Sequence, residues 1–218
     1  MVTLSEENYL KAIYHLGRLG SLSVSTNAIA DRINAKASSV TDMIKKLAEK
    51  NLVNYVKYQG VSLTEQGRIT AATVVRKHRL WEVFLVEKLN FRWDEVHDIA
   101  EQLEHVKSEK LVSKLDAYLG YPTRDPHGDP IPDKDGNIKS IEKSLLSQLR
   151  LNDSCVCVGL IDSSSDFLKY LDKNKIALGS NIQILSKESF DDSMTINVDG
   201  NIINISQQIS NNLYVKIK

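Results

Sequence analysis

The sequence predicts an α+β protein of three domains, and three observations support this prediction. The first third of the 218 residues has the pattern of short helices followed by a hairpin. The middle third consists of amphipathic helical segments, and the last third of short alternating strands. We therefore expect a winged helix-turn-helix domain at residues 1–72, a helical domain at 73–140 and a small β-barrel at 141–218.

In the first domain, SEENYLKAIYHLGRLG is an amphipathic helix for which Ser5 is the expected N-cap. A short helix in VSTNAIADRIN, a break and a third helix at residues 38–50 follow, with Ser38 or Ser39 as the cap of the third. Alternating apolar residues on both sides of Gln59-Gly60 then predict a hairpin. This order of elements is that of a winged helix-turn-helix.

The third helix of such a domain enters the major groove of DNA. Its first residues would face the bases, and its lysines and the wing lysine would reach phosphates. For any single lysine, a solvated surface role is a serious alternative, so the prediction depends on the whole pattern. The candidates are Lys36, Ser38, Ser39, Thr41 and Asp42 for the groove, and Lys45, Lys46 and Lys57 for phosphates.

Charge is unevenly distributed although the whole chain is neutral. Residues 1–80 hold 12 Lys and Arg against 6 Asp and Glu, whereas residues 81–142 hold 8 against 14. The basic first third suits a polyanion such as double-stranded DNA, and the acidic middle third suits cations.

The middle domain is expected to start in a long helix from Thr64 to about Leu89, and it contains the stretch HDIAEQLEHV at residues 97–106. On a helical wheel, Glu101, Glu104 and His105 lie within about 80° of His97, while the apolar residues lie opposite. Such a stripe is either a solvated surface or a metal site, and two histidines among carboxylates favour the metal site. His78 and Glu82 upstream also share a helical face, which gives a two-site hypothesis.

The remaining segments are simpler. Residues 121–137 hold all four prolines and predict an irregular connector. Five strand-like runs and one short helix follow, with Cys155 and Cys157 on one face of the first strand as two reduced thiols. No apolar run approaches the about 20 residues of a spanning helix, and no signal peptide is evident, so we expect a cytoplasmic protein without a membrane partner.

Taken together, these segments resemble the diphtheria toxin repressor family of iron- and manganese-dependent transcriptional regulators along essentially the whole chain. The resemblance lies in ENYLKAIYHL, SSVTDMIKKL, LTEQGR, RKHRLWE, HDIAEQLEHVKS and PHGDPIP. It implies that the C-terminal barrel is SH3-like. It also implies a repressor, not an enzyme, that binds palindromic operators as a homodimer when Mn²⁺ or Fe²⁺ is present, without a small-molecule substrate.

The family's metal ligands can be carried over residue by residue. The primary site would comprise Asn8, Glu101, Glu104 and His105, with Glu7 in reserve because asparagine brings no charge. The ancillary site would comprise His78, Glu82 and His97, with help from the barrel. Ser163 is a poor ligand there, so Asp166 is preferred over Asp162 and over His127 of the connector. Manganese-responsive members add an acid where this chain has Lys11.

The resemblance also ranks the metals. Cysteine at the position of Glu101 marks the iron-type members and glutamate the manganese-type ones, and oxygen and imidazole ligands suit a hard ion. We expect Mn²⁺ first and Fe²⁺ second, with Zn²⁺ or Co²⁺ binding in vitro. Two alternatives stay open from the sequence: a metalloenzyme that uses the His/Glu cluster, and a winged-helix regulator that does not respond to metal.

Overall fold

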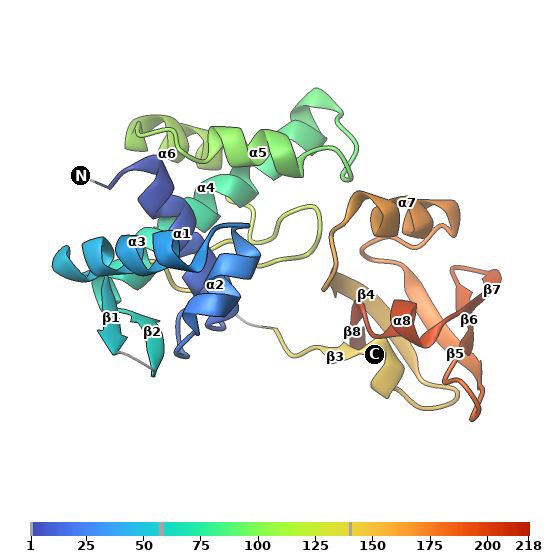
Figure 1. The fold of residues 1–218 in the computed structure, drawn as a ribbon. Coiled ribbons are helices and arrows are strands. Elements are labelled where there is room, and N and C mark those ends of the chain that lie inside the picture. Colours follow the sequence, from blue (N-terminus) through green and yellow to red (C-terminus); the bar gives the residue numbers. More distant parts are fainter. Residues whose placement is uncertain (1, 57–58, 140) are drawn as a thin grey trace. The chain divides into compact units, whose positions relative to one another are not determined.

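The computed structural model describes residues 2–56, 59–139 and 141–218 and confirms the predicted fold class. In the described residues, helices and a hairpin come first and a six-stranded antiparallel sheet comes last (Figure 1). Up to residue 120 the elements are α1 (Leu4–Leu16), α2 (Thr26–Arg32), α3 (Ala37–Glu49), β1 (Val53–Val56), β2 (Gly60–Leu63), α4 (Glu65–Leu89), α5 (His97–Leu103) and α6 (Glu109–Tyr118).

The chain divides into two compact units whose boundary runs through α4 and α5. The first unit holds Met1–Trp81, Ala100–Tyr121 and Ile131–Ile138. The second holds Glu82–Ile99, Pro122–Pro130 and Lys139–Lys218. None of the helices among the described residues is long and apolar enough to cross a membrane.

The N-terminus of α1 is set by Thr3, and the expected cap Ser5 is wrong. The Thr3 hydroxyl accepts a hydrogen bond from the Glu6 amide at 3.3 Å, and the Glu6 carboxylate accepts one from the Thr3 amide at 2.9 Å. This reciprocal pair is a capping box, which starts the helix two residues before Ser5 would. Leu10 and Ile13 of α1 are completely buried in the core of the first unit.

Helix α3 begins at Ala37 after Lys36, which makes no capping side-chain bond. The expected caps Ser38 and Ser39 are therefore wrong, because both lie inside the first turn and are exposed. The buried face of α3 consists of Val40, Ile44 and Leu47. This face packs in the core of the first unit and leaves the opposite face of the helix in solvent.

The predicted wing and the long helix that follows it are confirmed. Strands β1 and β2 pair from Val53↔Leu63 to Val56↔Gly60, and Gly60 adopts a φ of +95° at the turn. The Thr64 hydroxyl then accepts a hydrogen bond from the Gly67 amide at 3.0 Å and caps α4. A Cβ on Gly67 would overlap the Leu52 carbonyl oxygen, so glycine lets α4 start directly against the wing.

Helix α5 is shorter than the sequence pattern suggests, because it ends at Leu103 and not at residue 106. The Val106 amide bonds to the Leu103 carbonyl at 3.2 Å, which closes a tight turn. Ser108 accepts from the Leu111 amide and caps α6, so few residues separate the two helices. Glu104 and His105 consequently lie in the turn after the helix.

Residues 121–137 contain no helix or strand, as predicted for a connector. Gly128 within it has a φ of +87°, and a Cβ there would lie 2.5 Å from the Val158 carbonyl oxygen. The Leu160 amide also donates to the His127 carbonyl at 3.2 Å. The PHG segment is therefore fixed against β4, at a point where only glycine fits.

The C-terminal sheet has the strand order β3-β8-β4-β5-β6-β7, with every pair antiparallel. All five predicted strands and the predicted helix are confirmed, whereas β3 and α8 were missed because they span only two and four residues. Burial raises the pKa of Cys155 to about 12 and that of Cys157 to about 11, so both remain thiols. The elements are β3 (Ser144–Leu145), η1 (Leu146–Gln148), β4 (Ser154–Leu160), α7 (Ser165–Lys173), β5 (Asn181–Lys187), β6 (Met194–Val198), β7 (Asn201–Ile205), α8 (Gln207–Ser210) and β8 (Leu213–Ile217).

Candidate metal centre

Glu104 lies at the centre of a cluster of polar side chains in the first unit. Its side chain is 1% exposed. One carboxylate oxygen, Oε2, lies 2.6 Å from Lys11 Nζ and 2.6 Å from His78 Nδ1. Burial alone would raise the pKa of Glu104, but the hydrogen bond with His78 and the charge of Lys11 outweigh burial and lower this pKa. Glu104 is therefore a buried, charged carboxylate.

Helix α1 contributes Glu7 to this cluster. Glu7 Oε2 lies 2.6 Å from His105 Nδ1, and His105 Nε2 lies 3.7 Å from the second oxygen of Glu104. Asn8, the α1 residue predicted as a ligand, is exposed, and in this structure its neighbour Glu7 makes the contact with His105. An acidic residue of α1 is thus joined to the turn that follows α5.

Glu101 lies at the edge of the same cluster. Its side chain is 53% exposed, and its Oε1 lies 3.5 Å from Lys11 Nζ. Because α5 ends at Leu103, Glu101 is in the helix while Glu104 and His105 follow it. The predicted helical stripe is therefore not one helical face, although three of its four members still converge on Lys11 or Glu7.

These donors are of the types that bind a divalent cation, although among the described residues no three of Glu7, Glu101, Glu104 and His105 bring ligand atoms within 4.8 Å of one another. Carboxylate oxygens of Glu7, Glu101 and Glu104 and an imidazole nitrogen of His105 are ligand types of Mn²⁺, Fe²⁺ and Zn²⁺. The ammonium of Lys11 already lies among the carboxylates, which indicates that the cluster stabilises positive charge. Such an ion would supply two positive charges and several coordination bonds to the cluster.

A second cluster surrounds Glu82 in the second unit. Glu82 is 3% exposed; its Oε1 lies 3.7 Å from His97 Nδ1 and its Oε2 lies 3.8 Å from His127 Nδ1. Glu82, Asp125 and His127 are all buried, and one ligand atom from each lies within 4.8 Å of the others. His78 precedes Glu82 by one turn of α4. Glu82 is thus available to two different partner sets.

The barrel residues considered for this second site lie differently. Asp166 is exposed in the first turn of α7, and Asp162 accepts hydrogen bonds from the backbone and hydroxyl of Ser164. Among the described residues, neither belongs to a cluster of three or more potential ligands.

Sequence reasoning named His127 only as a weak candidate and missed Asp125. The signal was the D-x-H spacing of DPH at residues 125–127, since Asp125 directly precedes PHGDPIP and caps this turn. Its Oδ1 accepts from the amides of His127 and Asp129 at 2.9 Å each. Both roles of Asp125, turn formation and proximity to Glu82, depend on the same compact loop.

Protonation of His127 is expected to make folding pH-dependent in chelator-treated protein. Burial would lower the pKa of His127, but its interaction with Glu82 outweighs burial and raises this pKa from 6.5 to about 9. A raised folded-state pKa stabilises the fold fully below pH 6.5, and this stability is lost as the pH rises through 9. The unfolding free energy should fall by on the order of 3 kcal/mol across that range.

Urea denaturation from pH 6 to pH 10 measures this effect, with His127→Gln as the comparison. In the variant, the decline between pH 6.5 and pH 9 should be absent. An equal decline in both proteins would contradict the assignment to His127.

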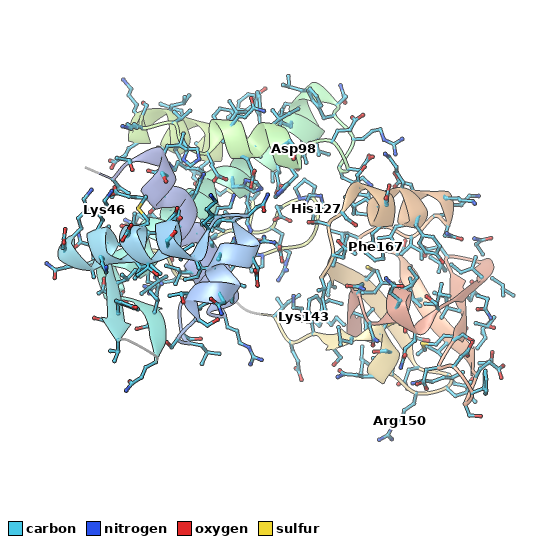
Figure 2. All side chains as sticks on the ribbon, viewed as in Figure 1. Lys46, Asp98, His127, Lys143, Arg150 and Phe167 are labelled. Carbon is cyan, nitrogen blue, oxygen red and sulfur yellow. The ribbon has the colours of Figure 1, made fainter. Side chains whose placement is uncertain are left out.

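The predicted DNA-contacting residues lie mostly on the solvent face of α3. Lys46 projects from this helix (Figure 2), and Lys45 is 61% exposed, 3.8 Å from the Asp42 carboxylate. Thr41 is half-buried and its hydroxyl donates to the Ala37 carbonyl at 3.0 Å. Lys57 lies outside the described residues. The other predicted residues, which are all exposed, are Lys36, Ser38, Ser39 and Asp42.

Comparison with family models gives three matches in chain order. Residues 1–61 match the iron dependent repressor N-terminal DNA binding domain. Residues 64–133 match the iron dependent repressor metal binding and dimerisation domain, and residues 145–217 match the FeoA domain.

Individual proteins are also similar. The iron-dependent repressor IdeR of Mycobacterium tuberculosis is 36% identical over 126 residues, 58% of this chain and 54% of that protein. The chain thus spans about half the length of such curated relatives. The diphtheria toxin repressor of Corynebacterium jeikeium is 31% identical over 144 residues, 66% of this chain and 60% of that protein.

Solved structures match over nearly the whole chain. A manganese-dependent transcriptional repressor in complex with manganese has a TM-score of 0.89 and 36% identity, covering 98% of this chain and all of the other. ScaR with bound Zn²⁺ has a TM-score of 0.77 and 34% identity, covering 97% and 98%. The chain therefore belongs to the diphtheria toxin repressor family of metal-dependent transcriptional regulators.

Proposed function

We propose that this protein is a metal-dependent transcriptional repressor that binds palindromic operator DNA in the cytoplasm as a homodimer. The observation that carries the proposal is the contact between Glu7 of α1 and His105, which itself lies beside Glu104. Helix α1 packs in the same core as the recognition helix α3. A ligand set shared between α1 and the turn after α5 therefore links the helix-turn-helix to the helical segment that follows it.

The chain's own residues account for the response to metal. Without a divalent cation, Glu7, Glu101 and Glu104 hold like charges close together, and the positive charges that offset them include those of Lys11 and Lys77. With a cation bound, these carboxylates would be neutralised and their mutual repulsion removed. Helix α1, and with it α3, would then be held in one position. Two recognition helices of a dimer must be spaced to fit successive major grooves, so a fixed position favours DNA binding.

For the primary site we propose Glu7, Glu101, Glu104 and His105, with Glu7 in place of Asn8. The contact of Glu7 with His105 at 2.6 Å and the exposure of Asn8 support this choice. We propose a second site at Glu82. In one arrangement its partners are His78 and His97. In the other its partners are Asp125 and His127, and this arrangement is supported by the burial of Glu82, Asp125 and His127.

For the metal, we propose Mn²⁺, with Fe²⁺ as the alternative. The absence of cysteine from the cluster and its three carboxylates favour a hard ion. The names of the relatives include both metals, since IdeR is iron-dependent and a structural relative is manganese-dependent. Zn²⁺ and Co²⁺ would bind in vitro by the general order of affinities.

For the dimer, the supporting feature is α6 and the turn after it. Leu111 is 44% exposed, Tyr118 66% and Tyr121 68%, so three large side chains of this segment present apolar surface to solvent. The family domain that matches residues 64–133 is described as a metal binding and dimerisation domain. Because the family consists of transcriptional repressors, the metalloenzyme alternative has no support.

The function is tested by fluorescence anisotropy on an inverted-repeat DNA fragment across a buffered metal series. We expect tight binding with Mn²⁺, weaker or equal binding with Fe²⁺, and loss of binding with chelator. A response to iron but not to manganese would reverse the metal ranking. Equal binding with and without chelator would indicate the metal-independent regulator.

A further inference from the structure

We propose that Lys11 is a tethered competitor of the metal: its ammonium group occupies Glu104 Oε2 and must leave this oxygen before a divalent cation binds to it. This inference rests on the proposed function, because it concerns regulation of the same site. Lys11 lowers the affinity of the site for the metal, so a higher metal concentration is needed to load the protein.

The contacts of Lys11 resemble those of a bound cation. Its side chain is only 12% exposed, although lysine side chains usually extend into solvent. Its Nζ lies 2.6 Å from Glu104 Oε2, 3.4 Å from His78 Nδ1 and 3.5 Å from Glu101 Oε1. The ammonium group is therefore surrounded by three residues that the sequence predicted as metal ligands.

A divalent cation and this ammonium group cannot use the same oxygen of Glu104 together. An ammonium at 2.6 Å takes the lone pairs of Oε2 that a metal would need, and two cations at such a distance repel strongly where water is scarce. Glu104 is 1% exposed, so water screens this repulsion poorly. Metal binding through Glu104 Oε2 thus requires that Lys11 withdraw.

Lysine is suited to this reversible role. Its charge sits on a flexible four-carbon stem and is strongly hydrated in water, so the ammonium can move away from α1 into solvent at moderate cost. In the metal-free protein it compensates a buried carboxylate that would otherwise be costly to keep charged. Lys11 therefore stabilises the empty site and opposes the loaded one, which a residue that only packs would not do.

The experiment compares full-length wild-type protein with Lys11→Met and with Lys50→Met as a matched control. Methionine keeps an unbranched side chain and removes the charge. Lys50 also forms an ion pair with a buried glutamate, at 2.7 Å from Glu6, but Glu6 belongs to no predicted metal site. Mn²⁺ is titrated against a chromophoric chelator at fixed pH, so the readout is metal affinity and not DNA binding.

We expect Lys11→Met to bind Mn²⁺ at least about tenfold more tightly than wild type, a change that corresponds to about 1.4 kcal/mol. Lys50→Met should bind like wild type. Equal or weaker binding by Lys11→Met would overturn the competition while leaving the repressor proposal intact. Binding by Lys11→Met alone would support the competition, and failure of every protein to bind would overturn both proposals.

A second measurement uses only wild-type protein, so it does not depend on folding of the variant. Lysine acetylation by a water-soluble reagent is followed by mass spectrometry with chelator and with Mn²⁺. Modification of Lys11 should increase several-fold when Mn²⁺ is added, whereas that of Lys50 should not change. Equal protection of Lys11 in both states would overturn the proposal.

Discussion

Glu104→Gln is expected to remove most metal binding, with a loss of Mn²⁺ affinity of at least about 100-fold, since changing a residue that merely orients a ligand already costs 10–100-fold. Glutamine has nearly the same shape, so the effect isolates the charge. Glu104 is the one predicted ligand whose carboxylate contacts both Lys11 and His78 at 2.6 Å. Isothermal titration with Mn²⁺ measures the change directly.

The matched control for this variant is Glu109→Gln. Glu109 is exposed in the first turn of α6, close to Glu104 in the chain but outside the cluster. The Glu109→Gln variant should bind Mn²⁺ with the affinity of the wild-type protein. If Glu104→Gln bound Mn²⁺ with wild-type affinity, the primary site would not be where we place it.

Removal of the two exposed lysines of α3 is expected to have the second large effect. Each lysine that neutralises a phosphate contributes about 0.9 to the slope of log affinity against log salt concentration. The double variant Lys45→Ala/Lys46→Ala should therefore lower this slope by about 1.8 and weaken binding to all DNA sequences similarly. Operator and unrelated DNA are compared by anisotropy at several salt concentrations in Mn²⁺.

A double variant in α7 and the turn after it, Lys173→Ala/Lys175→Ala, changes the net charge by the same amount at a distant place in the chain. Its salt slope should equal that of wild type. Equal slopes for all three proteins would contradict the placement of phosphate contacts on α3, and equal losses in both variants would indicate a general effect of net charge.

Sequence patterns predicted those parts of the fold that local periodicity determines. The alternation in SCVCVGL and the hairpin signal at Gln59-Gly60 identified β4 and the wing. Alternation is informative because only one side of such a strand is buried in a core. Helix ends were harder. The Thr3 cap was missed although TLSE at residues 3–6 has the T-x-x-E spacing of a capping box. Helix α5 was extended because a helical wheel carries no signal for a tight turn at Leu103.

The candidate site could be predicted only in part, for a physical reason. Residue types and spacing identified Glu104 and His105, but not which side chain of α1 reaches them. That depends on the packing of α1 in the core, which directs Glu7 toward His105 and Lys11 toward Glu104. The approach of Asp125 to Glu82 likewise depends on tertiary structure, since 43 positions separate the two in the sequence.

The central claim is that one cation joins the DNA-binding helices to the turn after α5, and it is tested most directly by the Mn²⁺ dissociation constant with and without operator DNA. Coupling between two sites is reciprocal and typically amounts to about 1–3 kcal/mol. We therefore predict that saturating operator tightens Mn²⁺ binding about 5–150-fold, whereas DNA of unrelated sequence does so less. Identical Mn²⁺ affinities with and without operator would contradict the claim.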